Sequence, residues 1–268
     1  MAQVINTNVA AIGAQRYLNK SQASLQTSLQ RLSSGLRINS AKDDAAGLSI
    51  SEGLTKQIRG YTQATRNASD AISMIQTAEG GLQEVGNMLQ RIRELAVQSV
   101  NGNYTATERS AMNAEVTLLT AEIDRVADKL TFNGTKVIGA SAAIAYQVGT
   151  DAGDKLTIDF INVSNVHGGA AVDTVSRASA AIALMDTAIN AISKQRGLFG
   201  ASQNRMESVI RTNETAVENL SASRSRVLDA DFAAESANLT RTQILQQAGS
   251  AMLSQANALP QNVLSLLG

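Results

Sequence analysis

Apolar residues of this chain recur at alternating intervals of three and four, as in Leu25, Leu29, Leu32 and Leu36. This spacing is typical of the packing seam between helices in a coiled coil. The 268-residue sequence contains a single proline, so a helix is free to continue through each such stretch. The pattern therefore predicts a mainly α-helical protein whose helices pack side by side.

Two of the predicted helices are unusually long. A seam from Ile58 to Ile92 lies in a proline-free stretch from about Asp44 to Ser99. If that stretch is one helix, it is on the order of 80 Å long at ~1.5 Å per residue. A shorter seam runs from Met112 to Leu130. A long seam with a few polar positions consists of Ile182, Met185, Ile189, Ile192, Arg196, Phe199, Gln203, Met206, Ile210, Asn213, Val217, Leu220, Arg224 and Val227. Polar residues within a seam commonly fix the register of the packing.

Local signals mark the breaks between these helices. The loop Asn101-Gly102-Asn103 ends the first long helix, and Thr105 with Glu108 has the spacing of a capping box that opens the next. Apolar and polar residues alternate at about 144–161, which predicts one β-hairpin. Residues 162–175 are rich in glycine, serine and asparagine and predict a loop. Together these signals indicate a long antiparallel coiled-coil helical rod with one small β-hairpin.

Candidate catalytic and metal-binding residues are scarce. The chain has no cysteine and one histidine, so it lacks the ligands of a typical zinc site and a cysteine nucleophile. Any Ser/His/acid arrangement would have to use His167, which lies beside two glycines and for which we expect a surface-loop position. We therefore expect no catalytic site, no metal, no cofactor and no enzymatic activity.

Charge is distributed very unevenly along the chain. Met1–Gln15 carries no charged residue, and neither does Thr242–Gly268, a stretch of 27 residues. A helix that faces water normally keeps charges on its outer side, so uncharged helices are usually covered on most sides. We expect both ends to become buried in contacts between copies of the chain. The apolar residues predicted for this packing are Val4, Ile5, Val9, Ile12, Ile244, Leu245, Met252, Leu259, Val263, Leu264 and Leu267.

Several classes of partner are disfavoured by the same composition. Lys and Arg number 23 and Asp and Glu also number 23, so the chain lacks the excess of positive charge that nucleic-acid binding needs. Apolar stretches are interrupted by glutamine, asparagine and serine, so we expect no membrane insertion. A head-to-tail contact that does not close into a ring produces a helical filament. The self-complementary uncharged ends therefore favour a homopolymer.

Several segments of the sequence closely resemble bacterial flagellin. They are the opening MAQVINTNVAAIGAQRYLNKSQASLQTSLQRLSSGLRINSAKDDAAGLSIS, then LQRIRELAVQS, AEIDRV with FNGTKV, FGASQNR, and the closing SASRSRVLDADFAAESANLTRTQILQQAGSAMLSQANALPQNVLSLLG. The likeness covers about 1–138 and 176–268. Large outer domains that most flagellins carry in the middle are missing, so the chain resembles a minimal flagellin.

The resemblance implies an architecture and a function. It implies an inner coiled-coil domain made of residues 1–40 and 230–268, a helical shaft domain at 41–175 that includes the hairpin, and a C-terminal shaft helix at 176–229. The implied function is that of the structural subunit that polymerises into the bacterial flagellar filament, the propeller for swimming motility. The implied location is extracellular, after secretion.

The resemblance also implies partners. These are the flagellar type III export apparatus, an export chaperone on the C-terminal helix at about 230–268, and the filament cap and junction proteins. The host Toll-like receptor for flagellin is a further implied partner, with recognition residues that match Arg91, Leu95 and Glu115. Arg91 and Leu95 are four residues apart, so they share a helix face, and we expect both to lie outside the seam and to contact a neighbouring protofilament.

Two other functions share part of this pattern. A hook-filament junction protein has similar terminal helices but forms one short ring of subunits. A soluble coiled-coil signalling hairpin shares the heptads and the richness in alanine, glutamine and serine, but it needs neither uncharged ends nor a β-hairpin.

Overall fold

The computed structural model describes residues 7–267, with side chains for residues 7–258, and it is predominantly helical. The helices are α1 (Val9–Ser34), α2 (Ala45–Val100), α3 (Ala106–Lys129), α4 (Val175–Leu228) and α5 (Phe232–Leu267). The strands are β1 (Thr131–Phe132), β2 (Thr135–Lys136), β3 (Ala142–Gln147) and β4 (Lys155–Phe160). The predicted fold class, mainly α with a small β-hairpin, is confirmed.

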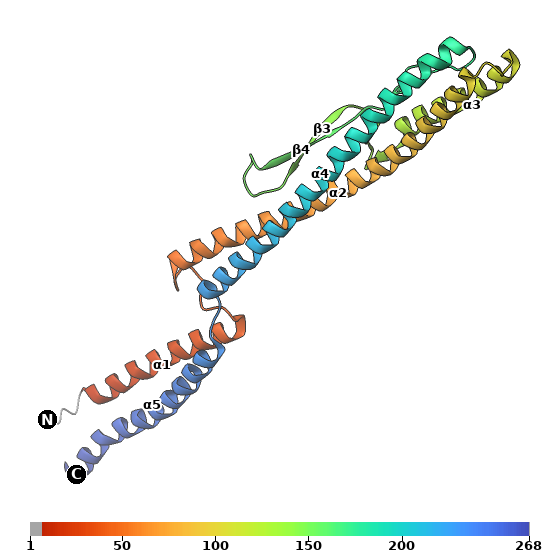
Figure 1. The fold of residues 1–268 in the computed structure, drawn as a ribbon. Coiled ribbons are helices and arrows are strands. Elements are labelled where there is room, and N and C mark those ends of the chain that lie inside the picture. Colours follow the sequence, from red (N-terminus) through yellow and green to blue (C-terminus); the bar gives the residue numbers. More distant parts are fainter. Residues whose placement is uncertain (1–6, 268) are drawn as a thin grey trace. The chain divides into compact units, whose positions relative to one another are not determined.

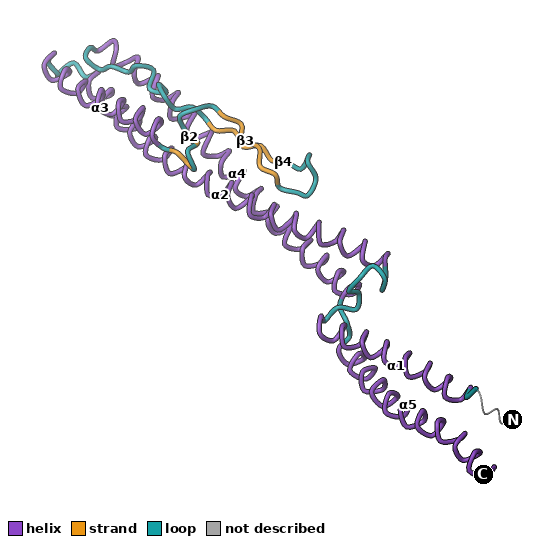
Figure 2. The backbone as a smooth tube through the Cα atoms, turned by 180° about the vertical axis from the view of Figure 1, so that it is seen from behind, coloured by secondary structure: helices purple, strands orange, loops and turns teal. Residues whose placement is uncertain are grey.

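The chain forms two compact units, one of residues 57–218 and one of residues 1–56 with 219–268. Within the first, α2 and α4 run antiparallel and side by side, α3 packs along α2, and the β3–β4 hairpin lies beside the long helices (Figures 1 and 2). None of the helices in residues 7–267 is long and apolar enough to cross a membrane.

Two stripes of side chains on α2 are buried. The main stripe alternates in steps of four and three and includes Leu82, Val85, Leu89 and Ile92, all fully buried as the sequence predicts. A second stripe repeats every seven residues, and three of its members, Met74, Gly81 and Leu95, are buried. A Cβ atom added at Gly81 would meet the side chains of Leu130 and Ile138. The second stripe therefore faces the end of α3 and the chain that follows it.

The seam on α4 is confirmed at every seventh position from Met185 to Asn213, and it is shifted by one residue at three intervening positions. Met185, Ile192, Phe199, Met206 and Asn213 are buried as predicted. At the intervening positions the buried residues are Ala181, Ala188 and Gln195, each one residue before the predicted Ile182, Ile189 and Arg196. Small alanine side chains let neighbouring backbones approach closely, so the larger isoleucines lie at the edge of the core.

The predicted hairpin is present as β3 and β4, paired from Ala142 with Phe160 to Gln147 with Lys155. Long helices hold it through side-chain amides that donate to its carbonyl oxygens. Gln195 donates to Asp159 at 2.6 Å, and Asn67 donates to Gln147 at 2.9 Å. The inward side chains of β4, which include Phe160, are buried.

A second, shorter hairpin was not predicted. β1 and β2 pair on either side of Asn133 and Gly134, whose φ angles are +48° and +79°. An Asn-Gly pair with both residues at positive φ is the preferred two-residue turn of a β-hairpin. The dipeptide was therefore a usable signal in the sequence.

His167 occupies a different environment from the one predicted. Its side chain is buried, with the residue only 8% exposed, and Nε2 lies 3.2 Å from Oδ2 of Asp124 on α3. Nδ1 accepts the Gly169 N–H at 3.2 Å. The prediction of a surface histidine without partners was wrong, because the loop after β4 folds against α3 and encloses the ring.

The other unit contains α1 and α5, which lie antiparallel (Figure 1). The residues that follow α1 bind the end of α4 and the residues after it. Leu36 forms a β-bridge with Asp229, and the Ala230 N–H donates to the Gly35 oxygen at 2.9 Å. Arg37 donates from its backbone N–H to Leu228 at 2.7 Å and from Nη2 to Val227 at 2.6 Å. We call this pairing of residues 35–37 with 227–230 the connector bridge.

Candidate functional site

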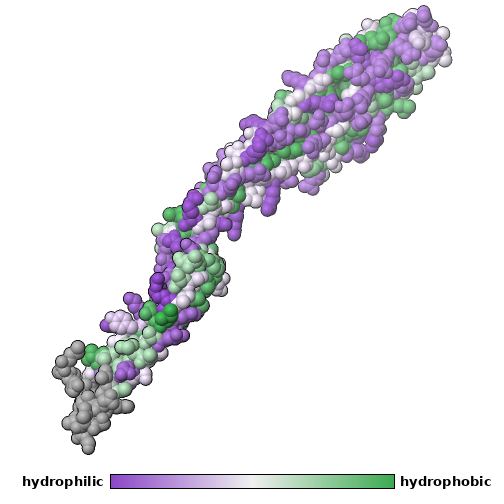
Figure 3. Space-filling view, turned by 60° about the horizontal axis from the view of Figure 1, so that its bottom comes forward, coloured by the Kyte–Doolittle hydropathy of each residue, from purple (hydrophilic) through white to green (hydrophobic). Residues whose placement is uncertain are grey.

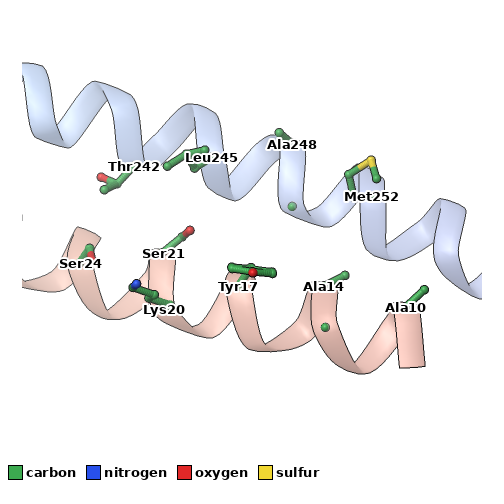
Figure 4. Close-up of a pocket in the computed structure, with 12 residues that line it drawn as sticks. Ala10, Ala14, Tyr17, Lys20, Ser21, Ser24, Thr242, Leu245, Ala248 and Met252 are labelled. Carbon is green, nitrogen blue, oxygen red and sulfur yellow. The ribbon is translucent and has the colours of Figure 1, made fainter. Parts of the chain in front are cut away.

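The most prominent surface feature of the α1–α5 unit is an apolar groove of about 620 Å³ between the two helices. Figure 4 shows Tyr17, Ser21 and Ser24 on the side of α1 that faces α5, with Thr242 and Leu245 opposite. Towards the free ends of the helices the groove is lined mainly by small residues, Ala10, Gly13, Ala14, Ala248 and Gly249, together with Met252. Small side chains leave the groove between the helices unfilled.

Predicted packing residues are exposed along these helices. Val9, Ile12, Ile244, Leu245 and Met252 have exposed fractions between 50% and 69%. Apolar surface gathers on this part of the molecule in the space-filling view (Figure 3). The predicted Val4 and Ile5 lie outside the described residues, and the side chains of Leu259, Val263, Leu264 and Leu267 also lie outside the described part.

Polar contacts hold the two helices together at either end of the groove. Near the free ends, Asn8 donates from Nδ2 to the Ala256 oxygen at 2.8 Å and also caps α1 by accepting the Ala11 N–H at 3.0 Å. Near the connector bridge, Arg31 Nη1 lies 3.8 Å from the buried Glu235 carboxylate. Specific contacts at both ends fix how the helices pair, whereas the groove between them remains open.

A second candidate surface lies on the 57–218 unit, where Arg91 of α2 meets Glu115 of α3. Arg91 Nε donates to Glu115 Oε1 at 2.9 Å, and Nη1 donates to Glu94 Oε2 at 3.1 Å. The bond to Glu115 is the main cause of a raised pKa for Arg91. Their side chains are about half exposed, at 50% for Arg91 and 45% for Glu115. The predicted pair therefore lies together on an accessible surface.

Leu95 lies beneath this surface. It lies outside the seam of Leu89, Ile92 and Ala96, as expected, but it is 2% exposed and belongs to the main hydrophobic core, so its side chain is not part of the accessible surface. Leu95 is buried because it belongs to the second buried stripe of α2, which a prediction based on a single heptad seam does not include. Val97, two residues further on, is 50% exposed instead.

Neither surface has the features of a catalytic or metal site. Within the described residues, no group of three or more His, Asp or Glu side chains is arranged to hold a metal ion. The apolar groove offers few charged groups, and those of the Arg91 network are already paired with one another. Both arrangements suit contact with another macromolecule.

Comparison with known proteins gives consistent matches over nearly the whole chain. The family model for the bacterial flagellin N-terminal helical region matches residues 5–143, and that for the C-terminal helical region matches residues 182–267. A flagellin of Halalkalibacterium halodurans is 44% identical over 270 residues, which cover 98% of this chain and 99% of that protein. The flagellar filament 33 kDa core protein of Treponema phagedenis is 42% identical over 284 residues, with 98% and 99% covered.

A solved structure agrees with these matches. The crystal structure of Bacillus cereus flagellin superposes with a TM-score of 0.52 at 31% sequence identity. The match covers 55% of this chain and 88% of that one.

Proposed function

This chain belongs to the bacterial flagellin family and is a structural subunit of the flagellar filament, and from that premise we propose that its α1–α5 surface drives polymerisation. The observation that supports the proposal is the exposed apolar surface along two helices whose outer parts carry no charge. Full burial of one leucine or methionine side chain contributes about 1.5–3 kcal/mol. Burial of several half-exposed side chains in contacts between copies of the chain would therefore supply a substantial driving force for polymerisation.

The relatives favour this function over the alternatives. They are named as flagellins and as filament core proteins, so neither a hook-filament junction protein nor a signalling hairpin is favoured. Flagellins are a family of structural proteins, in agreement with the expectation that the chain is not an enzyme. Flagellar filaments are extracellular, and we propose that the chain reaches that location by secretion.

We propose an inner domain of residues 1–40 and 230–268 and a shaft of residues 41–175 and 176–229. The connector bridge supports these boundaries, since it joins the residues that follow α1 to the end of α4 at Leu228 and the residues after it. The two compact units divide elsewhere, between residues 56 and 57 and between 218 and 219, within α2 and α4. In this proposal α1 and α5 become interior when copies stack, and the helices of the 57–218 unit form the layer around them.

We propose that the Arg91–Glu115 pair contacts a neighbouring protofilament and that the host Toll-like receptor for flagellin binds the same surface. Support comes from the exposure of both side chains and from their fixed mutual geometry. Leu95 acts here from below, by packing in the core under Arg91 rather than by direct contact.

The remaining proposed partners act on the C-terminal helix or on the finished filament. An export chaperone covers residues 230–268, which are apolar and largely uncharged and need protection before assembly. The flagellar type III export apparatus carries the chain out, and the cap and junction proteins contact it at the filament ends.

Removal of residues 243–268 tests the polymerisation proposal. The truncated chain retains the 57–218 unit and should remain soluble and helical by circular dichroism, yet fail to form filaments on seeding. A finer test replaces Leu245 by lysine, which introduces a charge into the groove, with Leu245→Met as the apolar control. Normal filaments from both Leu245→Lys and the truncation would refute the proposal.

A further inference from the structure

The loop between α2 and α3 holds an asparagine side chain in an unusual position. Asn101 Oδ1 accepts the backbone N–H of Asn103 at 3.3 Å, and the loop residues 101–103 are all exposed. A side chain that bonds to the backbone two residues ahead forms an Asx turn. The turn therefore holds the Asn101 side chain against residues 102–103 of the loop, which include the Gly102 nitrogen.

Gly102 offers that nitrogen with little obstruction. Glycine has no Cβ atom, so nothing shields its nitrogen from the preceding side chain. Within the described part of the chain, the Gly102 N–H donates to no hydrogen-bond acceptor.

A guanidinium group braces the same loop. Arg109 Nη1 donates to the Ser99 oxygen at 2.6 Å and to the Asn101 oxygen at 3.1 Å, and its Nη2 donates to the Tyr104 oxygen. These three bonds hold the loop at the main-chain oxygens of residues 99, 101 and 104, and none of them involves Gly102 or the Asn101 side chain.

We propose that Asn101 is a site of spontaneous deamidation. The Gly102 nitrogen forms a bond with Asn101 Cγ, the Cγ–Nδ2 bond breaks, and the proton of the Gly102 N–H leaves with Nδ2 as ammonia. The product is a cyclic imide between residues 101 and 102. Water then adds to either imide carbonyl and opens the ring to aspartate or isoaspartate, so solvent is the only co-reactant.

The chain contains a second Asn-Gly pair that is held differently. Asn133 and Gly134 form the turn of the β1–β2 hairpin, with φ of +48° and +79° and with paired residues on both sides. A turn fixed by its flanking strands resists the change of backbone geometry that ring closure needs. The two sites therefore provide an internal comparison, in which Asn101 reacts and Asn133 is protected.

Incubation of the full-length folded chain in mildly alkaline buffer, followed by peptide mass spectrometry, tests this inference. Deamidation replaces NH₂ by OH and raises the peptide mass by about 1 Da. The peptide that contains Asn101 should convert about ten-fold faster than the one that contains Asn133. In the same chain unfolded in denaturant the two rates should become similar, because both sites share the Asn-Gly sequence.

Gly102→Ala is the decisive variant. An alanine Cβ at this position meets no atom within 4 Å and the backbone is not in the left-handed region, so the loop keeps its fold. The methyl group hinders attack by the nitrogen, and conversion at Asn101 should fall about ten-fold while conversion at Asn133 stays unchanged. Equal protection of Asn101 and Asn133 in the folded chain, or an unchanged rate at Asn101 in Gly102→Ala, would overturn the inference.

Discussion

Asn213 donates from Nδ2 to the backbone oxygen of Val148 at 3.1 Å, which ties a polar position in the α4 seam to the end of the β3–β4 hairpin. Asn213 is buried at the same seven-residue spacing as Phe199 and Met206. Its polarity within an apolar stripe is explained by this bond, since a buried amide needs a partner. The seam therefore positions the hairpin as well as the helices.

Loss of this bond should destabilise the 57–218 unit. Asn213→Ala removes the donor and leaves the Val148 oxygen unpaired, so the free energy of unfolding should fall by about 1–3 kcal/mol. Urea unfolding of the monomer, followed by circular dichroism, measures the change. Asn204→Ala, an exposed position on the same helix, is the matched control and should be neutral within about 0.5 kcal/mol.

Leu95 should behave as a core residue. Leu95→Ala leaves a cavity under Arg91 and should lower the free energy of unfolding by about 2–5 kcal/mol. Val97→Ala, on the half-exposed face of the same turn, should cost far less. Thermal unfolding measures the loss of stability in each variant. Similar losses in Leu95→Ala and Val97→Ala would contradict the burial of Leu95.

Receptor recognition by the Arg91 surface is best tested without disturbing the core. Arg91→Ala removes the guanidinium but leaves Leu95 in place, and the concentration needed for half-maximal receptor activation should rise about ten-fold, or 1.4 kcal/mol. Arg125→Ala also removes an exposed arginine paired with a glutamate, Glu122, and should have no effect. A receptor-activation assay on soluble monomer compares the potencies of the two variants with that of the parent chain. Equal potency of Arg91→Ala and the parent chain would refute the proposed role.

Asp128 should titrate at unusually low pH. Hydrogen bonds from Lys136 and Lys129 lower its pKa from 3.8 to about 2. Because the folded-state pKa lies below the unfolded value, the stabilising contribution is present above 3.8 and is lost as pH falls towards about 2. An NMR titration of the carboxyl carbon should give a higher pKa in Lys136→Met, whereas Lys194→Met should leave it unchanged.

Much of the helical architecture follows from periodicity alone. The proline-free stretch predicted from about Asp44 to Ser99 is α2, from Ala45 to Val100. The capping box predicted from Thr105 and Glu108 is formed at the start of α3, with both reciprocal hydrogen bonds present. These features depend on residues close together in sequence, so local patterns suffice to predict them.

Features that depend on distant elements were harder to predict. Leu95 is buried because α2 is covered on more than one side: Arg91 reaches Glu115 of α3, whereas Arg93 reaches Asp186 of α4 at 2.6 Å. A single heptad seam describes a helix with one neighbour and misses the second stripe. His167 is enclosed only because its loop meets Asp124, 43 residues earlier in the chain.

The connector bridge joins groups about 190 residues apart, since Arg37 donates from Nη2 to the Val227 oxygen and from its backbone N–H to the Leu228 oxygen. Closing so large a loop carries an entropic penalty that grows with the logarithm of its length. In the proposed export, the chain leaves a narrow channel one end first, so the connector bridge can form only after both of its segments are outside. This contact therefore forms when nearly the whole chain has been delivered.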